Sequence, residues 1–164
     1  MSEFEKEHHK NPKNFTNPAV DIEWKQFRLN KVKAVVDEAY KIAHKNNKIL
    51  TAAVFPYPEM ADHMVRQRWD KWNVDKVLPM IYHSFYNEEL DWIGYATKQG
   101  VKDLEGRNTE LHTGLYIPAL KANELKQAIE TSKANGAKGV AVFSGGALKE
   151  DHLKVIKEFS EKLK

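Results

Sequence analysis

The sequence contains no cysteine, and this absence removes several kinds of chemistry at once. Without thiols the chain forms neither disulfide bonds nor thiolate metal sites, and it has no cysteine nucleophile. It also lacks an apolar run long enough to span a bilayer, and no signal-like apolar stretch follows Met1. We therefore expect the chain as given to be soluble. These absences leave its compartment unknown.

The chain also has no large excess of charge of one sign. The chain has 26 basic and 23 acidic residues, which give a net charge of +3. Because they are spread along the chain, they indicate solvated helix faces and argue against a surface for nucleic acid. The 164 residues, 41% of them hydrophobic, are enough for one globular domain with a sizeable core.

Residues 1–20 are polar, rich in Lys, Asn and His, and without periodicity, so we expect a loop or disordered arm there. The adjacent His8 and His9 have no partner carboxylate at a helical offset, which favours solvated side chains over a metal site. Residues 21–164 are then expected to form a single α/β domain.

Four short apolar runs alternate with amphipathic segments in that domain. Strands are expected at 49–55, 76–82, 111–117 and 139–144, and helices at 21–46, around Trp69 and Trp72, and at 88–98, 122–135 and 149–163. Asp21 suits an N-cap, and Gly136 suits the left-handed position after a helix. This repeat of about thirty residues predicts a parallel sheet with right-handed crossovers.

Two arrangements are possible for such a sheet. An open doubly wound sheet is typically marked by a glycine-rich turn after its first strand, where this chain has Pro56-Tyr57-Pro58-Glu59. The alternative is one helix and four βα units that resemble the second half of a TIM (β/α)8 barrel. We favour the half-barrel.

Several segments carry a resemblance to a known family. They are Trp24-x-x-x-Arg28, Val54-Phe-Pro56, Gly114-Leu-Tyr116 and, most specifically, Trp69-x-x-Trp72-x-x-Asp75-x-x-x-Pro79-Met-x-Tyr82. Together they resemble the glycosyl-hydrolase family that is itself similar to family ten, a group of TIM-barrel glycosidases and their relatives. The resemblance covers about residues 20 to 163 and implies strands five to eight. The family's first four strands, one of which bears a carboxylate, have no counterpart here, which implies a carboxyl-terminal half-barrel, either a fragment of a larger enzyme or a truncated product.

Candidate site residues follow the predicted strands, because parallel strands place their carboxyl ends at one edge. Glycoside hydrolysis needs two carboxyl groups, and Glu59 is the carboxylate nearest a predicted strand end, although it also suits the dipole of an early helical turn. His83 could orient a carboxylate or a sugar hydroxyl. The tyrosines expected to line a sugar site are Tyr57, Tyr82, Tyr86 and Tyr116.

The sequence leaves two other functions open. One is a non-catalytic carbohydrate-binding or structural remnant, because the second carboxylate is missing. The other is a phosphate-ligand enzyme of another barrel family, with the anion at Ser144-Gly145-Gly146. We expect no cofactor and no metal, because no set of ligands has the necessary spacing.

A half-barrel would also need a partner. The runs at 49–55 and 139–144 would be open edges beside apolar side chains meant for a barrel interior. We expect either self-association or pairing with a complementary amino-terminal half. The alternative is a flattened sheet with helices over both faces.

Overall fold

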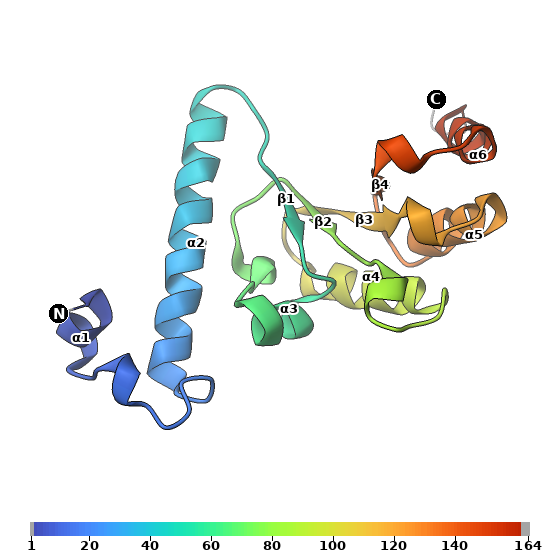
Figure 1. Cartoon of the computed structure of the whole chain (residues 1–164). Helices are drawn as coiled ribbons and strands as arrows, with labels where there is room; N and C mark the ends of the chain where they lie inside the picture. The colour runs from blue at the N-terminus through green and yellow to red at the C-terminus, as the bar shows by residue number, and fades with distance from the viewer. Residues whose placement is uncertain (1, 162–164) are drawn as a thin grey trace.

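The computed structural model describes residues 2–161 and shows an α/β fold built on one parallel sheet (Figure 1). Its strands are β1 (Thr51–Val54), β2 (Lys76–Pro79), β3 (Glu110–Tyr116) and β4 (Gly139–Phe143). They lie in the order β1-β2-β3-β4, and every neighbouring pair is parallel. Crossovers between parallel strands are almost always right-handed, and with this strand order they place the connecting helices on one face of the sheet. The predicted half TIM-like arrangement is confirmed.

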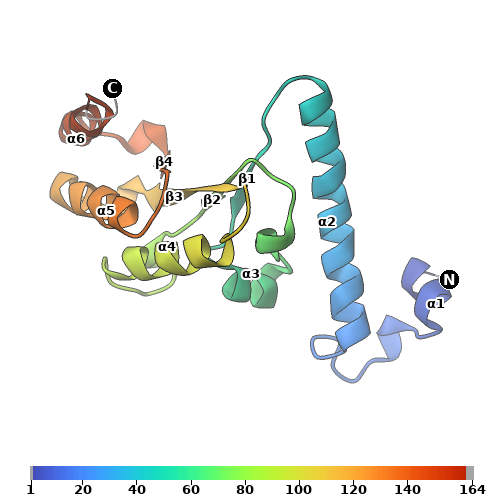
Figure 2. The same ribbon diagram turned by 180° about the vertical axis from the view of Figure 1, so that it is seen from behind.

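The three crossover helices cover the same face of the sheet and leave the other face without helices (Figures 1 and 2). They are α3 (Pro58–Val65), α4 (Trp92–Asp103) and α5 (Ala122–Ala134). The long helix α2 (Ile22–Lys45) stands beyond β1, and α6 (Glu150–Glu161) lies at the β4 end. A doubly wound sheet with helices on both faces is therefore excluded.

Several helix ends lie where the sequence predicts them. The carboxylate of Asp21 accepts the backbone N–H of Trp24 at 2.8 Å and caps α2. Gly136 follows α5 with a φ of 94°, a left-handed conformation that glycine adopts without steric cost. The predicted extension of the final helix to Leu163 lies outside the described residues.

The segment around the two tryptophans differs from its prediction. Helix α3 ends at Val65 because Arg66 adopts a left-handed conformation with φ 62°, and a short 3-10 turn, η2 (Trp69–Lys71), follows. One continuous helix carrying both indoles was therefore wrong. Trp69 and Trp72 are both buried and belong to the core.

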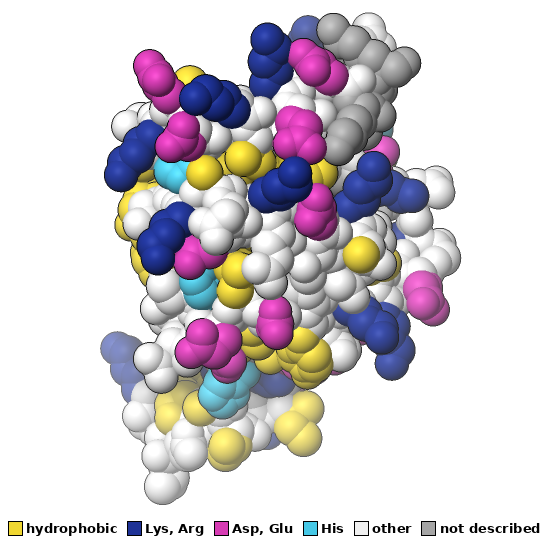
Figure 3. Space-filling model, turned by 90° about the vertical axis from the view of Figure 1, so that its right-hand side faces the viewer, with side chains coloured by type: hydrophobic (Ala, Val, Ile, Leu, Met, Phe, Trp, Pro, Cys, Tyr) yellow, Lys and Arg dark blue, Asp and Glu magenta, His cyan; other side chains and the backbone are white. Residues whose placement is uncertain are grey.

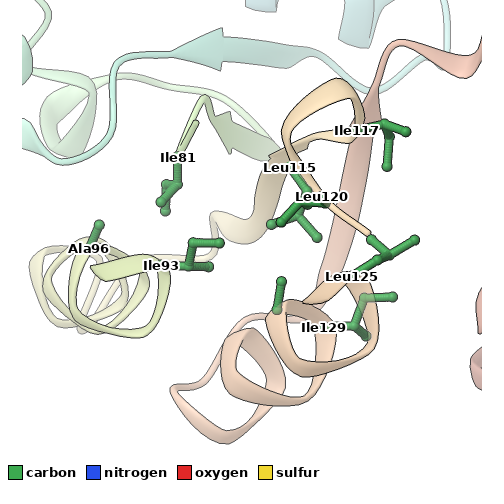
Figure 4. Packing of buried hydrophobic residues seen from close by; sticks show 9 residues of the cluster. Ile81, Ile93, Ala96, Leu115, Ile117, Leu120, Leu125 and Ile129 are labelled. Atoms are coloured by element: carbon green, nitrogen blue, oxygen red, sulfur yellow. The ribbon is translucent and has the colours of Figure 1, made fainter. Parts of the chain in front are cut away.

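The core lies between the sheet and its helices, in two clusters. Figure 4 shows the cluster nearer the carboxyl terminus, in which Ile93 and Ala96 of α4 and Leu125 and Ile129 of α5 lie below the strands. The other cluster joins Val54 and Val77 to Trp69 and Trp72. A buried pair of hydroxyl groups, Thr97 on α4 and Thr113 on β3, lies 3.0 Å apart between them.

The amino-terminal arm is more ordered than its composition suggests. Residues Glu3–His8 form a helix, α1, which begins with a capping box between Ser2 and Glu5. Phe4 is buried among the rings of Phe15, Trp24 and Phe27. The expected disordered arm is thus replaced by a short helix docked on α2, because one aromatic side chain finds an apolar place on that helix.

The remaining elements are single 3-10 turns in the connections. They are η1 (Pro12–Asn14), η3 (His83–Phe85), η4 (Ile117–Ala119) and η5 (Gly145–Ala147). η4 follows β3 directly, η5 begins two positions after the end of β4, and η3 begins four positions after the end of β2, so each of these three loops contains a 3-10 turn.

Candidate functional site

The alternation of side chains along the strands shows which residues occupy the face without helices. Leu115 and Ile81 belong to the core on the helix side, and Val142 packs against it. Successive side chains of a strand point to opposite faces, so Tyr116 and Phe143 belong to the face without helices. Tyr82 lies three residues beyond the end of β2, and its ring contacts both of these rings. Tyr116 and Phe143 are paired in register at the carboxyl ends of β3 and β4.

These three rings and that of Phe85 form an aromatic cluster. The ring centroids of Tyr82, Tyr116 and Phe143 are separated by 5.5, 5.9 and 6.3 Å, with interplanar angles of 36°, 15° and 23°. Phe143 is therefore stacked with both tyrosine rings, which are tilted against each other, and the three rings surround a common centre instead of forming a linear stack. Phe85 meets Tyr116 at 4.7 Å and Tyr82 at 5.6 Å, edge-on to both.

The aromatic cluster remains open to solvent. Phe85 is 64% exposed and Phe143 is 56% exposed, which is far more than a ring of a closed core would be. Tyr82 and Tyr116 are half-buried beneath them. Partial burial raises the pKa of the Tyr82 phenol above its ordinary value, so this group is neutral and able to donate a hydrogen bond near pH 7. The cluster combines flat apolar surface with hydroxyl groups.

Small residues form the floor next to the cluster. Met80 bridges to Gly114, which pairs with Ala141 on the next strand. A Cβ atom on Gly114 would lie 2.5 Å from the carbonyl oxygen of Pro79, so only glycine allows β2 and β3 to approach this closely. The sheet beside the rings therefore carries little side-chain volume at Gly114 and Ala141.

Charged side chains occupy the opposite end of the same face. Lys76 and His112 both contact the carboxylate of Glu110, at 2.9 and 3.1 Å. The hydrogen bond from Lys76, followed by that from His112, lowers the pKa of Glu110. Glu110 stands six positions before Tyr116 on β3, about 20 Å along an extended strand. The polar end and the aromatic end of the face are therefore separate.

The structure brings together two of the four predicted tyrosines. Tyr82 and Tyr116 belong to the aromatic cluster. Tyr57 instead meets Tyr95 of α4 edge-on at 6.1 Å, and Tyr86 packs on Trp92 at 5.2 Å. These two rings therefore interact with α4 and are not part of the cluster.

Glu59 and His83 follow the carboxyl ends of two adjacent parallel strands, and thus lie at the same edge of the sheet. Glu59 is exposed in the first turn of α3, where a carboxylate suits the helix dipole. Burial of Asp103, followed by the negative charge of Glu59, raises the pKa of Asp103 at the end of α4. His83 begins the η3 turn, and its carbonyl oxygen accepts the backbone N–H groups of Tyr86 and Glu88. The imidazole is half-buried.

The structure adds Phe85 and Phe143 to the predicted set. Phe143 could have been found by counting the alternation of β4 from Val142, whose side chain packs on the helices. Phe85 could not, because its position depends on the 3-10 turn between His83 and Phe85. No periodic pattern in the sequence marks that turn.

The predicted phosphate position, Ser144-Gly145-Gly146, lies at the η5 turn, where the backbone N–H groups of Ala147 and Leu148 donate to the carbonyl oxygens of Ser144 and Gly145 at 3.0 and 3.2 Å. Near it, a cavity of about 560 Å³ is lined by both Lys121 and Lys149, at the starts of α5 and α6. The backbone N–H of Lys121 donates to Glu124 at 2.7 Å, and that of Lys149 donates to the Nδ1 atom of His152 at 3.2 Å. Figure 3 shows this end of the molecule, where side chains of both charges are interspersed. Such an arrangement offers no concentrated positive charge for an anion.

Residues 2–161 contain neither a group of side chains suited to a metal ion nor a helix suited to a membrane. No three His, Asp or Glu side chains in this part of the chain are grouped closely enough to hold a metal ion. Among the described helices, none combines the length and the hydropathy of a membrane span.

Comparisons with known proteins were also negative: no protein-family model matches the chain, and no significant match was found among curated proteins or solved structures.

Proposed function

We propose that this chain binds carbohydrate through the aromatic cluster, as the half of a TIM-barrel glycoside hydrolase-like protein. The observation that carries the proposal is the set of clustered aromatic rings, inclined to one another by 15° to 36°, at the carboxyl edge of a parallel sheet on the face without helices. Rings of this kind offer a flat apolar surface for the C–H face of a sugar, while the Tyr hydroxyls reach its hydroxyl groups. The resemblance of the segment from Trp69 to Tyr82 to a family of TIM-barrel glycosidases supports the same substrate class.

Binding without hydrolysis is the expected activity of this chain alone. Retaining and inverting glycosidases both place two carboxyl groups within about 5 to 10 Å of each other around the bond. Glu110 lies at the far end of the face and is held by Lys76, so it does not reach a sugar on the rings. Glu59 would supply at most one of the two carboxyl groups, so we expect the chain alone to bind sugar without hydrolysing it.

The proposal is tested by titrating soluble polysaccharides and oligosaccharides into the purified chain by calorimetry. Tyr116→Ala and Phe143→Ala each remove one ring of the cluster and are expected to weaken binding about fivefold, in line with roughly 1 kcal/mol per aromatic contact. The matched control is Tyr95→Ala, which removes a tyrosine that is 53% exposed on α4, in the helix layer. Equal losses in all three variants, or no loss in the first two, would contradict the proposal.

Hydrolysis is examined separately with aryl glycosides. We expect no turnover by the chain alone. Turnover that Glu59→Gln abolishes would show that this chain supplies the whole catalytic apparatus, contrary to the proposed role as a binding half.

A further inference from the structure

Both edges of the sheet are open in the described part of the chain. β1 pairs with β2 only, and β4 pairs with β3 only, so each edge strand has one row of backbone groups without a partner strand. Sheet edges of this kind pair readily with another strand. The face between them lacks helices, as Figure 2 also shows.

The total exposed area indicates how much surface is left uncovered. A compact monomer of 18.9 kDa exposes about 8,300 Å² on the usual scaling with mass. This chain exposes 10298 Å², which is about 2,000 Å² more. Part of the excess belongs to the protruding α1 and α2, and the whole is of the size that one partner buries in a large obligate interface.

Helix α2 contributes an apolar side next to the open edge of β1. Val32 and Val36 pack on the core cluster, whereas Val35 is 73% exposed and Ile42 is 56% exposed. Residues seven apart lie on the same side of a helix, so Val35 and Ile42 form one stripe. Ile49, just before β1, is also 61% exposed. An apolar stripe beside an unpaired edge is what a helix presents when a further strand is meant to lie beneath it.

The helices at the two ends indicate which partner fits. In a closed parallel barrel, one helix covers each junction between neighbouring strands. α2 already stands at the junction before β1, and α6 at the junction after β4. If a second copy closed the barrel about a two-fold axis, α6 of one copy and α2 of the other would compete for the same junction.

From these observations we propose that the open face and both sheet edges bind a complementary half-barrel of four parallel strands joined by three helices, and not a second copy of this chain. Each of its edge strands pairs with one edge of this sheet, one beneath α2 and the other beneath α6. The partner thereby covers Val35 and Ile42 and encloses the face that carries the aromatic cluster. This inference does not depend on sugar binding, since the open edges exist whatever the rings bind.

The test uses the full chain and a designed probe. The probe is a four-strand, three-helix half-barrel whose edge strands are built to the register of Thr51–Val54 and Gly139–Phe143. Sedimentation velocity, binding of the dye ANS and hydrogen exchange are measured for the chain alone and after mixing. We expect a monomer that binds the dye and exchanges the outer amides of β1 and β4 rapidly. Mixing should give a one-to-one complex that releases the dye and protects both edges.

A matched pair of variants locates the interface on α2. Val35→Glu places a charge in the apolar stripe and should weaken the complex at least tenfold. Ala34→Glu places the same charge at the neighbouring exposed position, about 100° around the helix, and should leave the affinity unchanged. A dimer of the chain alone with both edges protected, a monomer that binds no dye, absence of a complex with the probe, or equal effects of the two variants would each overturn the proposal.

Discussion

The indole N–H of Trp69 donates a hydrogen bond to the carbonyl oxygen of Phe55 at 3.0 Å. This bond joins the η2 turn to the chain just beyond β1, although the two residues belong to different connections. The indole has no exposed surface and lies so close to Gly100 of α4 that a Cβ atom there would approach within 3.0 Å of its ring. Through these two contacts Trp69 links the η2 turn to the end of β1 and to α4.

We predict that Trp69→Phe lowers the free energy of unfolding by roughly 1 to 3 kcal/mol, because it leaves the Phe55 carbonyl without its donor and opens a small void. Trp69→Ala should cost about 3 to 5 kcal/mol. Urea unfolding followed by circular dichroism measures both. Trp92→Phe, at a half-buried position, serves as the control, and an equal loss in this variant would contradict the special role of Trp69.

Gly114→Ala should also destabilise the fold, for a different reason. The new Cβ would meet backbone atoms of Pro79 and Met80, which cannot move aside as a flexible side chain can. Forcing β2 and β3 apart should cost about 1 to 3 kcal/mol. The control is Gly146→Ala, where nothing lies within 4 Å of the added Cβ. Unchanged thermal stability in Gly114→Ala would argue against the tight approach of these strands.

Phe4→Ala tests how the amino-terminal helix is held. Phe4 is 1% exposed and contacts Phe15, Trp24 and Phe27, so its removal should detach α1 from α2. Because the core of the sheet lies elsewhere, we expect faster hydrogen exchange in residues 3–8 and nearly unchanged exchange in β3. Slow exchange in α1 of the variant would show that its capping box alone maintains the helix.

The strands were predictable because their apolar runs are bounded by proline, glycine and polar turns. β3, for instance, ends at Tyr116 just before Ile117 and Pro118. The end of α3 was not predictable, since Arg66 adopts a left-handed conformation without the glycine that usually signals one.

The site was only half predictable for a related reason. Position after a strand indicates the edge of the sheet at which a side chain lies, but not the face. Tyr82 and Tyr116 are reached by continuing the strand alternation. Tyr57 is the residue before α3, and its ring meets Tyr95 in the helix layer, while Tyr86 follows the η3 turn and packs on Trp92. A difference of one residue in a turn decides whether a ring lies on the face without helices or in the helix layer. Local sequence does not specify that difference.

The last prediction concerns the ion pair of Arg68 and Asp70 and its dependence on pH. The guanidinium donates to both carboxylate oxygens, at 2.9 and 2.8 Å, and the Asp70 side chain is only 4% exposed. Burial acts to raise the pKa of Asp70, but the hydrogen bonds and charge of Arg68, assisted by Lys71, outweigh it and hold that pKa below its ordinary value.

A carboxyl group whose pKa is lower in the folded than in the unfolded state stabilises the fold above its unfolded pKa of about 4, and this contribution disappears as the pH falls through the folded value. Asp70→Asn should therefore lower stability at pH 7 by roughly 1 to 3 kcal/mol, because Arg68 loses its partner. The variant should also lose less stability than the parent chain between about pH 5 and pH 2. Urea unfolding across this range measures both effects. Asp151→Asn, at an exposed ion pair with Lys154 at 3.5 Å, should leave the curve nearly unchanged, and a parallel decline of parent and Asp70→Asn with acid would show that Asp70 does not contribute to the acid sensitivity of the fold.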